Sequence, residues 1–183
     1  MFLTGSQIYL RPLAIADADD FYQWGNDREV IQYSLSSFAI PKSLAHYQQW
    51  LSASNSGKST IELGICCKET NKLIGYAGIA GISQLNRSGE YFILIGNKQY
   101  WGLGIASEVT RIVTQYGFET IGLHRIELTA FVENQAAVKA YTNAGYHHEG
   151  VKRQSGFRHG QFLDKVMMAV IAPQWLATNK SVL

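Results

Sequence analysis

The chain has 183 residues, of which 46% are hydrophobic and 16% are charged, and its formal net charge is +2. A chain of this length can bury a sizeable core as one domain, so we expect a single domain over residues 1–183. The near-neutral charge does not point to nucleic acid, and no apolar run is long enough to cross a membrane. We therefore expect no nucleic acid and no membrane among its partners.

The two cysteines, Cys66 and Cys67, are neighbours in the sequence. Adjacent residues of a strand point to opposite faces, so these two are poor partners for a disulfide. The lack of a disulfide framework, together with an opening segment too short for a signal peptide, predicts a cytoplasmic protein. No second cysteine pair or spaced histidine pair accompanies them, so no metal site is expected.

The first half of the chain predicts a strand, two helices and three further strands. Residues 7–11 predict a strand that ends at Pro12, and acidic residues at 17–20 mark the start of a helix. Residues 34–40 are expected to form a loop, and a second helix begins after Pro41. Apolar segments at 60–67, 73–82 and 89–95, separated by turn residues, then predict an antiparallel meander.

The second half predicts a helix, a strand, a second helix and two final strands. Apolar residues recur at helical spacing over 105–119. Residues 124–132 predict a strand, and residues 135–143 a helix whose end is marked by Gly145. Residues 146–151 and 162–170 predict the last strands. This order indicates an α+β fold.

A glycine-bearing stretch, residues 97–106, connects the apolar run 91–95 to the helix that follows. Glycines at 102 and 104 would let the backbone approach a ligand closely. The start of the helix adds unpaired N–H groups and positive potential, which suit a phosphate or pyrophosphate.

Other interpretations of such stretches are weaker. Gly102 and Gly104 also begin a dinucleotide fingerprint, but Ser107 occupies the third small position. Residues 57–60 resemble the end of a Walker A motif, but they lead into a strand rather than a helix. Taken alone, the stretch also fits a turn without a ligand.

The pattern Gln99-x-x-Gly102-x-Gly104 resembles the signature of the GNAT acyltransferases. Further motifs follow in that family's order and resemble its RimJ/RimL-type branch: residues 95–108, His-Arg-Ile-Glu-Leu at 124–128, Glu-Asn-Gln-Ala-Ala at 133–137, and Tyr141-x-x-Ala144-Gly145-Tyr146. The segment 24–30 also resembles a Trp-x-Asn-Asp motif of this branch. The resemblance covers most of the chain.

The resemblance implies a mixed, mostly antiparallel sheet with helices on both faces. In that fold the parallel strands around 91–95 and 124–132 splay apart to admit acyl-CoA. The resemblance further implies an N-acetyltransferase that moves the acetyl group of acetyl-CoA directly to a primary amine of a small molecule or a protein N-terminus. It leaves a homodimer open.

The resemblance also implies which residues bind CoA. The loop would hold the pyrophosphate through backbone N–H groups, and a backbone N–H near Leu94 and Ile95 would polarise the thioester carbonyl. At the family position that is often serine, this chain has Ala137. The full set is Leu94, Ile95, Gln99, Tyr100, Trp101, Gly102, Leu103, Gly104, Ile105, Ala106, Asn134, Ala137 and Tyr141.

Two residues are candidates for proton transfer. Glu90, where the family often carries an acid, would accept the proton of the ammonium through water; the alternative is a solvated strand-end carboxylate, and His124 is a rival base. Tyr141 stands where many family members have the tyrosine that protonates the leaving thiolate. Its phenol, with a reference pKa of about 10, is protonated at neutral pH, and the alternative is a core aromatic.

The sequence names the amine less clearly than the acyl donor. Aromatic residues that could wall the acceptor pocket fit a core equally well: Trp24, Tyr33, Phe38, Tyr47 and Trp50. Protein N-termini, polyamines, aminoglycosides and amino sugars all remain open as acceptors. A second hypothesis, from another functional class, is an acyl-CoA-binding sensor or interaction module of the same fold without turnover.

Overall fold

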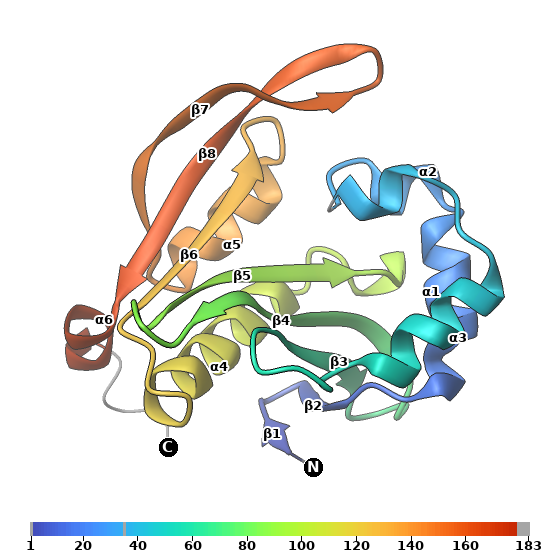
Figure 1. The fold of residues 1–183 in the computed structure, drawn as a ribbon, viewed down its shortest axis with the longest axis horizontal. Helices are drawn as coiled ribbons and strands as arrows, with labels where there is room; N and C mark the ends of the chain where they lie inside the picture. The colour runs from blue at the N-terminus through green and yellow to red at the C-terminus, as the bar shows by residue number, and fades with distance from the viewer. Residues whose placement is uncertain (1, 35, 179–183) are drawn as a thin grey trace.

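The structure, a computed structural model, describes residues 2–34 and 36–178. Eight strands form one sheet in the order β1-β2-β3-β4-β5-β6-β8-β7 (Figure 1). Their bounds are β1 Leu3–Thr4, β2 Ile8–Pro12, β3 Ile61–Cys67, β4 Leu73–Ser83, β5 Ser88–Ile95, β6 Arg125–Phe131, β7 His147–Arg158 and β8 Gln161–Ile171. All neighbouring strands are antiparallel except β5 and β6, which confirms the predicted mixed sheet.

Helices cover both faces of the sheet. α1 (Ala18–Gly25) and α3 (Leu44–Ala53) pack on one face, and α4 (Ile105–Glu119) and α5 (Gln135–Asn143) on the other. The predicted helices at 105–119 and 135–143 are confirmed. The remaining helical pieces are α2 (Arg28–Ile31), α6 (Ala172–Thr178), and the short 3-10 turns η1 (Ile15–Asp17), η2 (Ser36–Ala39) and η3 (Lys98–Tyr100).

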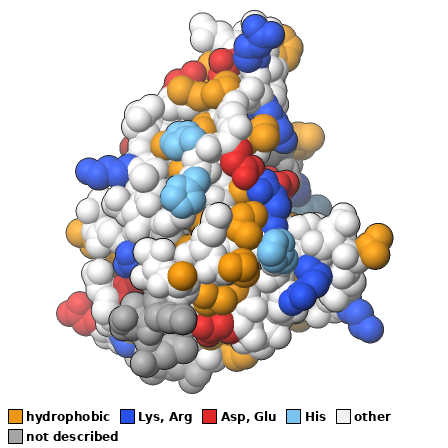
Figure 2. Space-filling view, turned by 90° about the vertical axis from the view of Figure 1, so that its left-hand side faces the viewer, with side chains coloured by type: hydrophobic (Ala, Val, Ile, Leu, Met, Phe, Trp, Pro, Cys, Tyr) orange, Lys and Arg blue, Asp and Glu red, His pale blue; other side chains and the backbone are white. Residues whose placement is uncertain are grey.

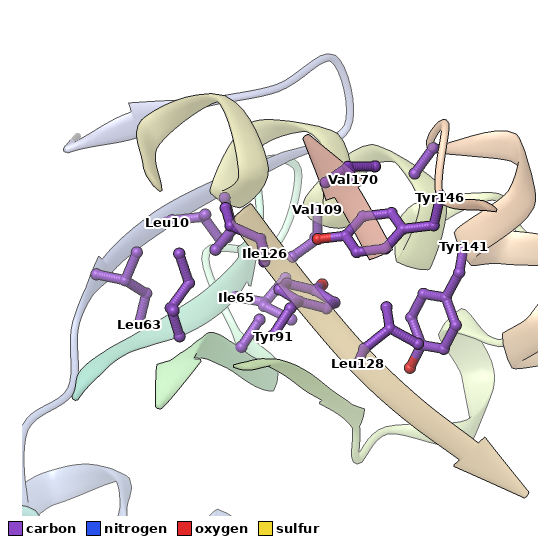
Figure 3. Packing of buried hydrophobic residues seen from close by; sticks show 14 of the residues in the cluster. Leu10, Leu63, Ile65, Tyr91, Val109, Ile126, Leu128, Tyr141, Tyr146 and Val170 are labelled. Atoms are coloured by element: carbon purple, nitrogen blue, oxygen red, sulfur yellow. The ribbon is translucent and has the colours of Figure 1, made fainter. Parts of the chain in front are cut away.

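Each face of the sheet has its own hydrophobic cluster. The larger cluster lies under α4 and α5, and Figure 3 shows part of it around Tyr91, Tyr141 and Tyr146. The second lies under α1 and α3 and is rich in aromatic rings. Cys66 belongs to the second cluster and Cys67 to the first, and both are free thiols. The prediction that these neighbours point to opposite faces is therefore confirmed.

The parallel pair β5 and β6 opens into a gap. The two strands pair only at Ser88–Arg125, Gly89–Ile126 and Glu90–Glu127, and they diverge beyond Glu90 (Figure 1). β6 pairs instead with β8 over its whole length, from Arg125 to Phe131. The splayed strand pair expected from the sequence is thus present.

The structure differs from the sequence prediction at several segments. The expected loop at 34–40 is wrong for 36–39, which form η2, while Leu35 lies outside the described residues. Strand β7 extends to Arg158, far beyond the predicted 151, because a two-residue turn with positive φ at His159 and Gly160 continues the β7–β8 hairpin. Its polar stretch 152–155 has no apolar alternation to announce a strand.

Surface charge is mixed on the side formed by the edge strand β7 and α6. Figure 2 shows Lys and Arg side chains interspersed with Asp and Glu, without a large patch of one sign. Within the described residues, no helix is both long and apolar enough to cross a membrane.

Candidate active site

The loop between β5 and α4 has the geometry of an anion site. Gly102 has φ of +76° and Gly104 has φ of +79°, a region that L-residues with side chains rarely adopt. Gly104 is also the N-cap of α4, so no side chain caps the N–H groups of the first turn. A Cβ added at either glycine would meet no atom within 4 Å, so the backbone there is open to a ligand.

These features fit the pyrophosphate of CoA. Helix α4 has 15 residues, and its first-turn N–H groups lack side-chain partners in a region of positive helix potential. The predicted loop residues Gln99, Gly102, Leu103 and Gly104 are exposed around this helix end, whereas Ile105 is buried beneath it. Donor groups of this kind suit a doubly charged phosphate ester.

The segment around α2 fixes the start of this loop. The ammonium of Lys98 lies 2.8 Å from the Asp27 carboxylate and 2.9 Å from that of Glu29. The hydrogen bond from Lys98 lowers the pKa of Asp27, whose side chain also caps α2. Trp24 packs so closely on Gly96 that a Cβ there would lie 2.0 Å from the indole. The Trp-x-Asn-Asp motif therefore supports the loop.

The gap between β5 and β6 exposes alternate backbone groups of β5. The Gly96 N–H donates to the Ile74 carbonyl, and Gly75 pairs with Ile95 in the next position of this antiparallel ladder. Since the two kinds of pair alternate, the N–H and C=O of Ile95 face away from β4 and into the gap. The main chain of Leu94 faces β4 instead. Of the two predicted positions, Ile95 is the one that offers its N–H to a ligand in the gap.

Trp101 already uses one of these groups. Its indole N–H donates to the Ile95 carbonyl at 2.8 Å, and its side chain is 38% exposed. Tyr100 is half-buried, and its hydroxyl lies 3.4 Å from that of Thr70 in the β3–β4 turn. Both predicted aromatic residues thus brace the loop by side-chain contacts, whereas the backbone at Gly102 and Gly104 is open.

Three tyrosines line the cluster on the α4–α5 face. The Tyr141 ring lies 6.1 Å from that of Tyr91 and 6.3 Å from that of Tyr146. The hydroxyl of Tyr91 accepts from Thr110 at 3.0 Å, and that of Tyr146 lies 2.9 Å from the Thr114 hydroxyl. Figure 3 shows the Tyr141 hydroxyl beside Leu128, directed away from the other two.

The Tyr141 phenol is suited to hold a proton. Among the residues that the structure describes, none hydrogen-bonds to its oxygen, and burial raises the pKa of Tyr141 to about 12. Asn134 caps α5 by accepting from the Ala137 N–H at 3.2 Å, so its predicted capping role is confirmed. Ala137 and Tyr141 lie on α5, and Asn134 caps its start.

A cavity of about 450 Å³ lies on the other face of the sheet. Glu90 and Phe92 of β5 project into it because they alternate with Tyr91, which belongs to the opposite cluster. The lining residues are Ser37, Phe38, Lys42, His46, Tyr47, Trp50, Thr60, Glu62, Tyr76, Ala80, Glu90 and Phe92. Two carboxylates among aromatic rings make this cavity suited to an amine with an apolar stem.

The structure separates the predicted acceptor residues. Phe38, Tyr47 and Trp50 line the cavity together with Glu90, whereas Trp24 lies under the loop. Tyr33 lies outside the cavity, with its ring 5.9 Å from that of Phe131. Glu62 and Tyr76 also line the cavity and were not predicted from the sequence; the alternation of the strands at 60–67 and 73–82 is the signal that could have placed them on this face.

The histidines do not form a second site. His124 is exposed at the entry to β6, away from the cavity lining, and His147 and His148 are exposed on the edge strand β7. Across residues 2–34 and 36–178, no group of three His, Cys, Asp or Glu side chains could hold a metal ion.

Comparisons with known proteins agree with this geometry. A family model described as an acetyltransferase (GNAT) domain matches residues 7–147. The chain is 29% identical to the uncharacterized N-acetyltransferase YoaA of Bacillus subtilis, over 94% of this chain and 97% of that protein. It is 25% identical to the spermidine N(1)-acetyltransferase of Escherichia coli, over 95% and 91% respectively.

A solved structure shows the same fold. The crystal structure of spermidine N-acetyltransferase from Vibrio cholerae, in complex with CoA and spermine, superposes with a TM-score of 0.84. The match covers 94% of this chain and 99% of that one at 25% sequence identity.

Proposed function

Since the chain belongs to the GNAT acetyltransferase family, we propose that it moves the acetyl group of acetyl-CoA to a primary amine by direct transfer. The observation that carries the proposal is the arrangement across the splayed strands. The uncapped loop of α4 and the Tyr141 phenol lie on one side of the sheet, and the cavity with Glu90 lies on the other. The CoA complex of the Vibrio cholerae relative supports acetyl-CoA as the cosubstrate.

The proposed roles follow from these positions. Glu90 takes the proton of the ammonium through water, which leaves a neutral amine to attack the acetyl carbonyl carbon. The Ile95 N–H, which faces the gap, stabilises the negative charge that develops on the carbonyl oxygen. When the C–S bond breaks, Tyr141 gives its proton to the thiolate sulfur, and the second proton of the attacking nitrogen, lost as the amide forms, passes through solvent to restore the phenol.

Several finer statements belong to the same proposal. Residues 1–183 form one N-acetyltransferase domain of the RimJ/RimL-like branch, as the order of the sequence motifs suggests. The acceptor is a small or peptidyl amine, and the spermidine acetyltransferases among the relatives support the small-molecule case. The free, buried thiols of Cys66 and Cys67 support a reducing, cytoplasmic compartment.

The first test concerns the cofactor. CoA should raise the melting temperature of the wild type, since a ligand that binds only the folded state stabilises it. Gly102→Glu places a carboxylate at the open anion site and should abolish this stabilisation. Gly160→Glu is the matched control, because Gly160 has φ of +77° and equally open surroundings but lies in the β7–β8 turn. Equal CoA shifts in both variants would remove the loop as the phosphate site.

The second test concerns turnover. Acetyl-CoA consumption is followed through the released thiol, with peptides, polyamines, aminoglycosides and amino sugars as acceptors. Transfer to at least one class is expected. CoA binding without transfer to any of them would favour the sensor or interaction module instead.

A further inference from the structure

Two cations contact the ring of Phe131, at the end of strand β6. The Lys165 ammonium lies 4.8 Å from the ring centroid, and the Arg158 guanidinium carbon lies 5.0 Å from it. Phe131 itself is buried, and Lys165 is its partner in the β6–β8 ladder. Phe131 therefore has a cation from β7 and a cation from β8 within about 5 Å of its ring.

Neither cation has an ion-pair partner in the described part of the chain. No Asp or Glu there lies within 4.0 Å of Lys165 or Arg158, although five such pairs occur elsewhere. Arg158 donates to the carbonyls of Phe157 and Ser34, and its Nε is buried without a hydrogen-bond partner. Partly buried charges that lack a counter-ion cost stability, and a bound anion would offset that cost.

The electrostatic surroundings of Lys165 connect it to the cavity. Burial lowers the pKa of Lys165, and the positive charges of Arg158 and Lys152 lower it further. The negative charge of Glu90 acts in the opposite direction and raises it. Phe131 projects to the same face as Glu90, since Ile126, Leu128 and Ala130 of its strand belong to the cluster on the opposite face. The cavity lining thus holds the carboxylates of Glu62 and Glu90 together with the ammonium of Lys42. Lys165 and Arg158 lie outside that lining, at a ring on the same face of the sheet, and Lys165 is near enough to Glu90 for their charges to interact.

We propose that the acceptor is a small amine that also carries an anionic group, which Lys165 and Arg158 hold while Glu90 faces the amine. This rests on the proposed function and narrows its acceptor class. A polycation such as spermidine would bring a second positive charge toward two cations that have no counter-ion. An α-amino acid, or an amine that bears a phosphate monoester, offers its amine to Glu90 and its anionic group to Lys165 and Arg158.

Matched pairs of acceptors test the charge requirement. L-phenylalanine is compared with L-phenylalaninamide, and O-phosphoethanolamine with ethanolamine; spermidine is the cationic reference. Without an anion site, L-phenylalaninamide would react faster than L-phenylalanine, because its less basic amine has a larger neutral fraction at neutral pH. We expect instead that kcat/KM favours the anionic member of at least one pair by tenfold or more. The favoured pair distinguishes a carboxylate from a phosphate.

A variant assigns the preference to the site. Lys165→Met keeps an unbranched side chain over Phe131 but removes the charge, and should lower kcat/KM for the anionic acceptor about 10- to 100-fold while sparing the neutral one. Arg111→Met removes an equal charge from the exposed face of α4 and should leave the ratio unchanged. A wild-type preference for the neutral amines or spermidine, or a ratio unaffected by Lys165→Met, would overturn the proposal.

A binding measurement decides the case without turnover. With the loop saturated by CoA, inorganic phosphate at constant ionic strength should raise the melting temperature of the wild type and of Arg111→Met, but not of Lys165→Met. Equal shifts in all three proteins, or none, would refute the anion site. If no amine is acetylated but the phosphate-induced rise in melting temperature still requires Lys165, the proposed function fails and the anion site stands.

Discussion

Removing single hydroxyls from three clustered tyrosines should separate catalysis from stability. The hydroxyls of Tyr91 and Tyr146 bond to Thr110 and Thr114, both of which are fully buried. Tyr91→Phe and Tyr146→Phe should each lose a net hydrogen bond, at a cost of about 1–2 kcal/mol. Tyr146→Phe also leaves the Thr114 hydroxyl short of a partner, whereas the Thr110 hydroxyl still donates to the Ala106 carbonyl at 2.6 Å. For a chain of this size, such a cost corresponds to a melting temperature lower by about 2–8 °C.

Tyr141→Phe should behave in the opposite way. Its hydroxyl has no hydrogen-bond partner among residues 2–34 and 36–178, so removing it should change the free energy of unfolding by less than about 0.5 kcal/mol. If the phenol protonates the thiolate, turnover should fall by about 10²–10⁴-fold. The other two variants should keep turnover within about threefold of the wild type.

Thermal melts and acetyl-CoA turnover on the three variants provide the measurement. Tyr146→Phe is the matched control, because it removes the same atom from a ring 6.3 Å away. Near-wild-type turnover in Tyr141→Phe would make this residue a core aromatic. A loss of melting temperature as large as that of Tyr146→Phe would show that its hydroxyl has a structural partner.

Three further predictions concern charge and pH. Glu90→Gln should lower kcat/KM most at neutral pH, and kcat/KM should recover as rising pH supplies neutral amine. Glu62→Gln, in the same cavity, should keep the pH profile of the wild type. A loss of kcat/KM that is constant across pH would argue against Glu90 as the base. Burial raises the pKa of Tyr141 from 10.0 to about 12, so the folded state keeps a proton that the unfolded state loses. Stability should therefore fall as pH rises from about 10 to 12, and Tyr141→Phe should flatten this slope in urea titrations. Asp17→Ala removes the buried carboxylate that pairs with Arg11 at 2.6 Å and should cost about 1.5–3 kcal/mol in denaturant melts, with a change below 0.5 kcal/mol counting against it.

Helix bounds were predictable where local chemistry determines them. Asn134 and Ser43 cap their helices through side-chain hydrogen bonds, and Gly145 adopts φ of +94° just after α5. These contacts lie within a few residues of the helix ends, so the sequence carries the whole signal. The glycines at 102 and 104 are of the same kind, since their positive φ is a local requirement.

The acceptor side could not be predicted to the same extent, because register and long-range packing create it. Lys165 is one of several strand lysines until the β6–β8 register places it opposite Phe131. Trp24 was predicted either to contact the acceptor or to belong to the core, and it is a buried core residue whose ring packs on Gly96, 72 positions along the chain by numbering. A sequence motif can indicate that an aromatic residue is needed near the active site, but it does not show whether the ring lines the cavity or packs under the loop.

The two-residue period of strand β5 determines which of its side chains face the cavity and which face the α4–α5 cluster. Along β5, Glu90 and Phe92 face the cavity, while Tyr91 and Ile93 face the α4–α5 cluster that holds Tyr141. The proposed base and the proposed acid are therefore kept on opposite faces, beside the point where β5 and β6 stop pairing beyond Glu90. A one-residue shift of β5 would turn Glu90 into the apolar cluster and bring Tyr91 into the cavity. Because both faces of β5 are packed, that register is strongly specified, and the Glu90 carboxylate and the buried Tyr141 phenol are held on opposite faces of the sheet.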